Sequence, residues 1–575
     1  MKPLFYFYAA ALFFLSGCTK DDDQLSPDPF FPSQETFKAP LFIEVYTPDG
    51  FRVSNAKVML GAQEGYTDAS GLLYLKEATV GATAYLTVEK EGYFHASRRF
   101  YAMPGKAQTI RIILLSNSRI AFFNAGDGAV LPLEDQATIR FPKGGYVLDD
   151  GDSYEGVVVI SAKVIAADDP DLSLMMPGDL VGVNSAGQLG ALGSLGMITV
   201  EMKTPNGDKL KFKDDVEATM EMIIPAAMTD KAPSTIPMWY FDEYAGVWKE
   251  EGVATRAGDR YIGQVRHFSF WNYDAWFSTI EWGASFAYED GSPASQVKVC
   301  ITIDNLGTSK CEYTDAEGSV HGLVAKDERL GLTVLGACNE VLYESVLGPY
   351  SGNALIGPVS IANSGALSRI SGYVVDCLHK PLSDGFVKVS TGRESYYLIP
   401  DPQTGAFESI VSSCIGGNIT VFSYNNTDMT FSDVRTVPYS PVINTDTLLT
   451  CSTLEEYAII EIEGFPNPIY FDSLEFRIFE EYTSIRAEDI SGSMFGVWFE
   501  GSTIGSYYAM KDSGVRGVID SIQFQSLGPL RITIDAYGAA GEYVTGKVQG
   551  KVHTSEFGPI PEYQMTGRFS VRRDQ

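Results

Sequence analysis

The stretch Thr67-Asp68-Ala69-Ser70-Gly71 separates short runs in which apolar and polar residues alternate. Aspartate, serine and glycine favour a tight turn, because the polar side chains bond to nearby backbone amides and glycine adopts positive φ without strain. Alternation with a period of two is typical of β-strands. We therefore predict a small β-sandwich over residues 41–117, with strands at 41–45, 57–60, 84–88 and 109–114.

The same order of strands and turn occurs twice more along the chain. Residues 314–318 repeat the turn as TDAEG, and residues 401–405 repeat it as DPQTG without the leading threonine. Repetition on this scale indicates a row of modules. We predict a second β-sandwich at 276–364 and a third at 365–452. The arrangement resembles the carboxypeptidase regulatory-like β-sandwich, a module that carries no catalysis in that family.

Residues 118–275 and 453–575 also contain strand-like runs but differ from this pattern. The first segment closes on residues 267–272 (HFSFWN) and resembles the extracellular β-domain of astroprincin-like and cartilage-intermediate-layer-like proteins. The last segment, which ends near 565–573 (MTGRFSVRR), resembles the closing module of other surface lipoproteins. The chain is therefore predicted to be all-β, as tandem Ig-like or prealbumin-like β-sandwich modules.

The composition limits the partners that this chain can bind. Its 575 residues are too many for one hydrophobic core. With 43 basic and 73 acidic residues, the net charge of -30 repels nucleic acid, so we expect no nucleic-acid partner. Beyond residue 18, no apolar run approaches the length of a transmembrane helix.

The first residues have the pattern of a secretory signal peptide. Lys2 supplies the positive charge and residues 4–15 the short apolar run, which is followed by Ser16 and Gly17. The sequence LSGC at 15–18 resembles the lipobox of bacterial lipoproteins. That resemblance implies cleavage after residue 17 and acyl chains on Cys18, whereas the alternative is an ordinary signal in which this cysteine is incidental.

Residues 18–40 are rich in Asp, Ser and Pro and are predicted to form an acidic tether. The residues Lys20, Asp21, Asp22 and Asp23 resemble the export signal of Bacteroidota lipoproteins. The resemblance implies a protein that acyl chains hold in the outer membrane and that is exposed on the cell surface.

Six cysteines remain after the acylated one, and all lie in the second and third predicted sandwiches. An even number of cysteines in a protein outside the cytosol favours disulfides. Two of them flank the turn of a predicted hairpin symmetrically, so we expect them to form a disulfide. Each of the two modules holds three cysteines, so one cysteine per module stays unpaired unless these two pair between the modules. A zinc site is the alternative to disulfides, but the sequence lacks the spacing of cysteine and histidine that is typical of zinc sites. The expected pair is Cys300 with Cys311, and the others are Cys338, Cys377, Cys414 and Cys451.

The sequence offers little that is typical of catalysis or metal binding. Five histidines are scattered over different modules, and neither HExxH nor GxSxG occurs. Asp150, Asp152 and Glu155 lie close together and could supply oxygen ligands to calcium, although a solvated acidic loop explains them as well. We therefore predict no enzyme and no cofactor other than a possible calcium ion. A hydrolase with its site in 118–275 or 453–575 remains an alternative.

Trp271 and Trp276 lie in a stretch that holds five of the six tryptophans. Exposed tryptophans stack on sugar rings, whereas tryptophans on paired strands pack into a core, and we favour packing. Our prediction is a surface protein that acts as a non-catalytic binding, adhesion or scaffolding module for an extracellular glycan or protein. One alternative is a glycan-binding accessory of a polysaccharide-uptake system, with a row of exposed aromatic residues. Another is a structural adhesin with an exposed strand edge.

Overall fold

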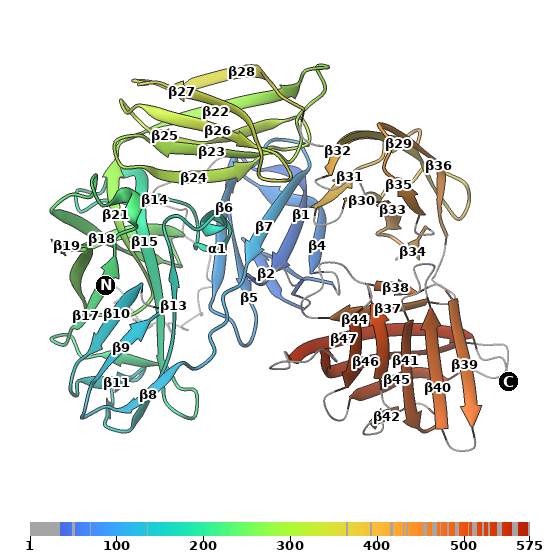
Figure 1. The fold of residues 1–575 in the computed structure, drawn as a ribbon, viewed down its shortest axis with the longest axis horizontal. Helices are drawn as coiled ribbons and strands as arrows, with labels where there is room; N and C mark the ends of the chain where they lie inside the picture. Colours follow the sequence, from blue (N-terminus) through green and yellow to red (C-terminus); the bar gives the residue numbers. More distant parts are fainter. Residues whose placement is uncertain are drawn as a thin grey trace, which may run out of the picture.

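The computed structural model describes residues 35–572 as a succession of β modules (Figure 1). The first module lies between the second, third and fourth modules, and the last follows the fourth. The described range has gaps at 49–51, 54, 69–70, 135, 364–365, 392–393, 414–417, 429, 433–434, 452–456, 463–468, 472, 480–481, 489–493, 504, 509–514, 520–521, 527–529, 538–542 and 555–561.

The first module is a β-sandwich of two sheets with strand orders β4-β1-β7 and β3-β2-β5-β6. Its first and last strands pair in parallel, and the other pairs are antiparallel. Alternate residues of both sheets point into one apolar core. Its strands are β1 (Phe37–Tyr46), β2 (Lys57–Leu60), β3 (Gln63–Tyr66), β4 (Leu72–Val80), β5 (Thr83–Glu89), β6 (Ala96–Tyr101) and β7 (Gln108–Ile113).

The third module repeats this topology, with sheets β25-β22-β28 and β24-β23-β26-β27. Again the first strand pairs in parallel with the last. Its strands are β22 (Thr279–Tyr288), β23 (Lys298–Ile303), β24 (Thr308–Tyr313), β25 (Ser319–Ala325), β26 (Leu330–Leu335), β27 (Val341–Leu347) and β28 (Ala354–Ile361).

The fourth module has the same core topology, with sheets β32-β29-β36 and β31-β30-β33-β34, and β35 also pairs with β33. The repeat seen in the sequence is therefore a repeat of the fold. Its strands are β29 (Ala366–Asp376), β30 (Gly385–Thr391), β31 (Glu394–Leu398), β32 (Ala406–Ser413), β33 (Asn418–Asn425), β34 (Thr430–Phe431), β35 (Arg435–Pro438) and β36 (Val442–Thr450).

The second module is larger and contains an 11-stranded sheet with the order β8-β13-β15-β21-β18-β19-β20-β17-β10-β9, to which β14 adds, and a small sheet β12-β11-β16. Its elements are β8 (Ala121–Asn124), β9 (Ala129–Leu133), β10 (Ala137–Phe141), β11 (Tyr146–Leu148), β12 (Ser153–Tyr154), β13 (Val157–Ile165), α1 (Leu172–Met175), β14 (Val181–Val183), β15 (Leu189–Lys203), β16 (Leu210–Phe212), β17 (Ala218–Ile223), a short 3-10 helix (Ala226–Met228), β18 (Thr235–Asp242), β19 (Val247–Ala257), β20 (Arg260–Val265) and β21 (Phe270–Phe277).

The last module also contains an 11-stranded sheet, and its apolar core is separate from those of the other modules. Its strands are β37 (Tyr457–Ile462), β38 (Ile469–Phe471), β39 (Ser473–Phe479), β40 (Tyr482–Glu488), β41 (Met494–Glu500), β42 (Gly505–Tyr508), β43 (Val515–Ile519), β44 (Ile522–Ser526), β45 (Arg531–Tyr537), β46 (Tyr543–Thr554) and β47 (Glu562–Arg572). The chain is therefore all-β, as the sequence predicts.

The repeated turn requires glycine for a steric reason. Gly71, Gly318 and Gly405 have φ of +66°, +76° and +74°. A Cβ atom at these positions would lie 2.8, 2.3 and 2.3 Å from a carbonyl oxygen of the module's first strand. Only glycine, which has no side chain, allows the turn to lie this close to the backbone of the first strand.

Replacing Gly318 by alanine is expected to destabilise the third module by about 2–4 kcal/mol, because the new Cβ meets backbone atoms at positive φ. Gly291→Ala is the matched control, since Gly291 has φ +82° but nothing within 4 Å of its added Cβ. It should cost about 1 kcal/mol. Hydrogen exchange of the β22 and β25 amides measures both effects, and equal losses would contradict this explanation.

Candidate functional site: the junctions and the cleft between modules

A buried carboxylate joins the first module to the fourth. The side chain of Glu44 in β1 is fully buried. It accepts hydrogen bonds from Arg52 Nη1 and Arg111 Nε, each at 3.1 Å. It also accepts one at 2.8 Å from the hydroxyl of Tyr397, which lies on β31 of the fourth module. These partners compensate the charge inside the protein.

The surroundings of Glu44 keep it ionised. Burial raises its pKa, but the charges of Arg52 and Arg111 and a hydrogen bond from Tyr46 outweigh burial and lower the pKa from 4.5 to about 2. The unfolded chain binds a proton at a higher pH than the folded chain does. Folding is therefore favoured by ionisation of this carboxyl group.

Arg111 extends the same junction to the third module. Its Nη2 donates to Gln296 Oε1 at 2.5 Å, and its guanidinium lies 4.6 Å from the ring centroid of Tyr313. The same Nη2 lies 3.6 Å from Glu394 Oε2 of the fourth module. One guanidinium group therefore contacts three modules, and any change in their relative positions would break part of this set.

Aromatic residues surround the ionic contacts between the first and fourth modules. The ring of Phe42 stacks on Tyr74 and on Tyr397, with ring centroids 4.7 Å apart in both pairs. Phe386 of the fourth module meets Phe42 edge-on at 5.3 Å. The cluster excludes water from the ion pairs and adds apolar burial to the interface.

An apolar cluster and hydrogen bonds to backbone groups join the first module to the second. Arg99 donates from its side chain to the carbonyl oxygens of Ala245 and Gly246. Its backbone amide donates to the oxygen of Gly178 at 3.0 Å. Tyr85 adds a hydroxyl bond at 3.1 Å to the carbonyl of Glu243. These contacts fix the β18–β19 turn of the second module against β6.

Lowering the pH is expected to weaken the junction of the first and fourth modules. Because the pKa of Glu44 falls to about 2, its contribution of about 3 kcal/mol is complete above pH 4.5 and is lost as the pH falls towards 2. Glu44→Gln should remove this dependence and cost about 3–5 kcal/mol at neutral pH, because two buried guanidinium groups lose their counter-charge. Hydrogen exchange of β1 and β31 as a function of pH measures both effects.

Glu64→Gln serves as the control for this experiment. Glu64 lies on β3, and its carboxylate pairs with Lys57 at 3.2 Å on the surface. Its replacement should leave exchange of β1 and β31 unchanged. An unchanged pH dependence in Glu44→Gln would show that another group controls the junction.

Several residues that the sequence singled out lie outside the described residues. These are Cys18, the export-signal residues Lys20, Asp21, Asp22 and Asp23, and Cys414. Their roles stay predictions from the sequence.

The expected hairpin disulfide is present. Cys300 on β23 faces Cys311 on β24, with an S–S distance of 2.01 Å. A second disulfide joins Cys377 to Cys451 across the fourth module. Cys338 is also disulfide-bonded.

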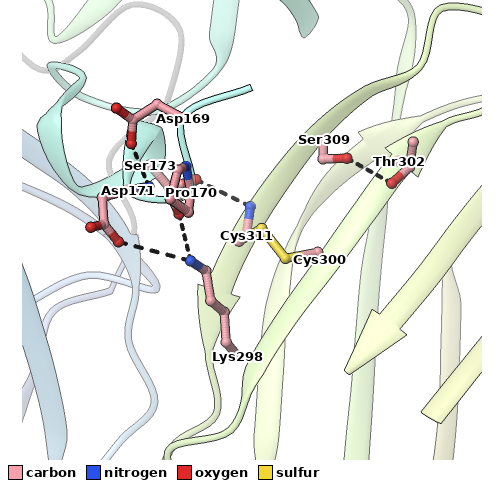
Figure 2. The surroundings of a disulfide bond; sticks show 9 residues. All are labelled: Asp169, Pro170, Asp171, Ser173, Lys298, Cys300, Thr302, Ser309 and Cys311. Carbon is pink, nitrogen blue, oxygen red and sulfur yellow. Dashed lines mark hydrogen bonds and ion pairs between the residues drawn. A yellow bond between two sulfur atoms is a disulfide. The ribbon is translucent and has the colours of Figure 1, made fainter. Parts of the chain in front are cut away.

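The first of these disulfides lies against the second module, as Figure 2 shows. The Cys311 amide donates to Ser173 Oγ at 3.1 Å, next to the short helix α1. Lys298 Nζ donates to the Pro170 carbonyl at 2.5 Å and lies 3.9 Å from Asp171. The acidic segment 168–171 therefore belongs to the contact between the second and third modules.

Two of the predicted calcium ligands, Asp150 and Asp152, lie on an exposed loop between β11 and β12, and Glu155 follows β12. Asp150 accepts a hydrogen bond from the backbone amide of Asp152 at 3.0 Å, and the neighbouring Asp149 pairs with Lys211 at 2.7 Å. In the described part of the chain, no group of three or more His, Cys, Asp or Glu residues is placed to hold a metal ion. The geometry of Asp150, Asp152 and Glu155 gives the calcium prediction no support.

Trp271 packs into the apolar core, as we favour from the sequence, and its alternative role as a ligand-binding residue is not supported. Its side chain is fully buried, and its Nε1 donates to the carbonyl of His267 at 3.0 Å. Trp276 is half-buried and packs against an apolar cluster that the first and second modules share. Trp271 and Trp276 pack in two different apolar clusters, and residues 270–274 of β21 are all buried, so this strand is covered on both faces.

The described aromatic residues also do not form the row that glycan binding predicts. Those most exposed are distributed over four modules: Tyr66, Phe122, Tyr244, Tyr373, Tyr482 and Tyr508.

A cavity of about 170 Å³ lies within the second module, which is one of the two segments where the hydrolase alternative places its site. Apolar residues and glycine dominate its lining, and Gln136 and Asp168 supply the polar side chains. This lining does not pair a nucleophile with a base, so the cavity does not favour hydrolysis.

A cleft with two lobes opens where the first three modules meet. The apolar lobe is lined by residues such as Leu192 of the second module and Val299 of the third. The polar lobe is lined by residues such as Arg98 of the first module. Each lobe has a volume of about 60 Å³, and the two share four lining residues: Lys310, Glu312, Val320 and His321. The two lobes therefore adjoin each other.

Three buried polar groups at this cleft have no hydrogen-bond partner among the described residues. They are Trp282 Nε1 and Thr308 Oγ1 at the apolar lobe and the Tyr101 hydroxyl at the polar lobe. A buried polar group without a partner costs about 1–3 kcal/mol. The sequence gives no signal for this site, because its residues come from three modules and are brought together only by docking.

The fold and this site define a protein of tandem β-sandwich modules with a cleft between them. No family model and no curated protein matches the chain. Solved structures that align with it include the shaft pilin spaA from Lactobacillus rhamnosus GG, at 10% identity over 31% of this chain and 98% of that chain, with a TM-score of 0.17.

Two other similar structures are also pilins. The Streptococcal ancillary pilin aligns at 10% identity over 38% of this chain and 95% of that chain, with a TM-score of 0.14. BcpA, the major pilin subunit of Bacillus cereus, aligns at 9% identity over 72% of this chain and 100% of that chain, with a TM-score of 0.12. TM-scores this low support no inference about this chain. The description of its fold therefore rests on its own strand pairing alone.

Proposed function

We propose that this chain is a lipid-anchored scaffold on the outer face of the outer membrane, which presents binding surfaces without catalysing a reaction. The observation that carries the proposal is the set of buried junctions around the first module. Glu44 and Arg111 fix the fourth module, and Arg99 fixes the second. Domains of one chain move freely unless such interfaces hold them, so these contacts support a scaffold with fixed geometry.

The proposed location comes from the sequence. The LSGC stretch at 15–18 supports acylation of Cys18, and the acidic residues that follow support export to the cell surface. In the part of the chain that the structure describes, no helix is long and apolar enough to span a membrane. Two or more acyl chains anchor a large protein stably, whereas one binds only weakly.

A second candidate function is adhesion through strand addition. β27 and β28 each pair with one neighbouring strand in the described structure and lie at the outer edges of the third module's sheets. They carry the exposed side chains of Val341, Val346 and Leu355. An edge strand of this kind can accept a strand from a partner protein.

Replacing Cys18 by serine is expected to move the protein from the membrane fraction to the soluble fraction, because the acyl chains would have no attachment site. Metabolic labelling with palmitate and cell fractionation measure this effect. Cys377→Ser is the matched control, since it removes a disulfide cysteine and should leave fractionation unchanged. Retention of the Cys18→Ser variant in the membrane would contradict the proposed anchor.

Replacing Lys20, Asp21, Asp22 and Asp23 together by alanine tests exposure on the cell surface separately. The variant should stay in the membrane fraction but become resistant to protease added to intact cells, because the export signal is lost. Wild-type protein should be cleaved under the same conditions. Cleavage of both proteins at the same rate would remove the support for this signal.

A further inference from the structure

The cavity of about 170 Å³ within the second module has the form of a small-molecule site. Its lining comes mainly from the end of β13 and the residues after it, the bulge of β15 and the end of β17. Ile165, Leu195 and Met222 are buried and form its floor, whereas Gln136 and Asp168 are exposed and form its mouth. A ligand can therefore enter from solvent and reach an apolar interior.

The size and the floor of the cavity favour an aromatic body. An apolar cavity of about 150 Å³ is sufficient to hold benzene, so this one accommodates a single six-membered ring. Met222 supplies a thioether sulfur, which makes favourable contacts with aromatic rings. Ala166 and Ala167 also line the cavity, and their short side chains leave this space open. The body of the ligand is therefore one ring with a short substituent.

The charges at the mouth favour a cation. Among the described residues that line the cavity, Asp168 is acidic and none is basic. Lys298, which contacts the same acidic segment, pairs with Asp171 at 3.9 Å, and Lys163 on β13 pairs with Glu134 at 3.7 Å. These lysines leave the carboxylate of Asp168 open to a ligand. The net charge of -30 also attracts cations to the surface.

We propose that this cavity binds a small aromatic molecule that carries one positive charge, with benzylammonium as its simplest representative. The ring lies on the floor against Met222, and the ammonium group donates to the carboxylate of Asp168 at the mouth. The amide oxygen of Gln136 can accept a second hydrogen bond from the same group. The inference rests on the proposed function, a protein that binds without catalysis, and names a ligand class for it.

The test compares benzylammonium with benzyl alcohol and benzoate, which keep the ring and change the polar group. Ligand-observed NMR and titration calorimetry on the purified full-length protein at neutral pH should show binding of benzylammonium. Benzyl alcohol should bind about threefold more weakly, because one exposed ion pair contributes little. Benzoate should bind at least about tenfold more weakly, because its charge has the same sign as that of Asp168.

No binding of benzylammonium would overturn the proposal. An affinity for benzyl alcohol or for benzoate as high as that for benzylammonium would also overturn it, because the carboxylate at the mouth would then not select a cation.

Ala167→Trp tests the location, because its large side chain should fill the cavity and abolish binding of benzylammonium. Ala186→Trp is the matched control. Ala186 is exposed on the turn between β14 and β15 of the same module and does not line the cavity. This variant should bind benzylammonium as the wild type does, and an equal loss in both variants would contradict the location.

Asp168→Asn tests the charge and provides a second test if Ala167→Trp does not fold, as judged by circular dichroism. It should weaken binding of benzylammonium about threefold and leave binding of benzyl alcohol unchanged. Asp214→Asn is its control, because Asp214 is exposed on the same module but outside the cavity. An equal loss in Asp214→Asn would show general attraction by the net charge and would overturn the assignment to Asp168.

These measurements do not depend on the lipid anchor, because the cavity lies within the described second module. Binding is measured in solution, so its failure is distinct from a failure of the fractionation or protease tests of the proposed function.

Discussion

The buried carboxylate of Glu44 determines how the modules can dock. A carboxylate taken out of water without partners costs several kcal/mol, so burial of Glu44 requires the groups around it to be in place. Two of these groups, Arg52 and Arg111, come from its own module, whereas Tyr397 comes from the fourth. Aromatic packing alone tolerates small shifts, but a hydrogen-bonded charge does not. The ionic contacts therefore give the junction its specificity, and the aromatic cluster around Phe42 adds the apolar burial.

The cleft is a consequence of the same docking. Its lining comes from the first, second and third modules, whose positions the junctions fix. The contacts on either side of the gap are well paired, as with Arg98 and Glu312. Among the residues that line it, Trp282 and Thr308 have a buried polar atom without a hydrogen-bond partner in the described part of the chain. A scaffold held by polar junctions can keep such unsatisfied groups, because the free energy of the surrounding contacts outweighs their cost.

Local features of the fold could be predicted from the sequence, and features made by docking could not. The turn at 67–71 is encoded by adjacent residues, and so is the hairpin that places Cys300 opposite Cys311. Glu44 looks like any polar residue in an alternating strand, since Tyr397 lies 353 residues away in the sequence. Trp271 is fully buried, as expected for a tryptophan on paired strands, although the sequence does not show that β21 is covered on both faces. The acidic segment 168–171 contacts Lys298 of another module, and no local pattern in the sequence reveals this contact.

The central claim is that buried junctions hold the modules in one arrangement. The most direct test is the distance distribution between spin labels on the first and fourth modules, at the exposed positions Tyr66 and Tyr373. Pulsed electron paramagnetic resonance on the full chain at neutral pH should give a single narrow distribution centred on the separation in the structure. A broad distribution, or several separated peaks, would show that the modules move independently and would contradict the account.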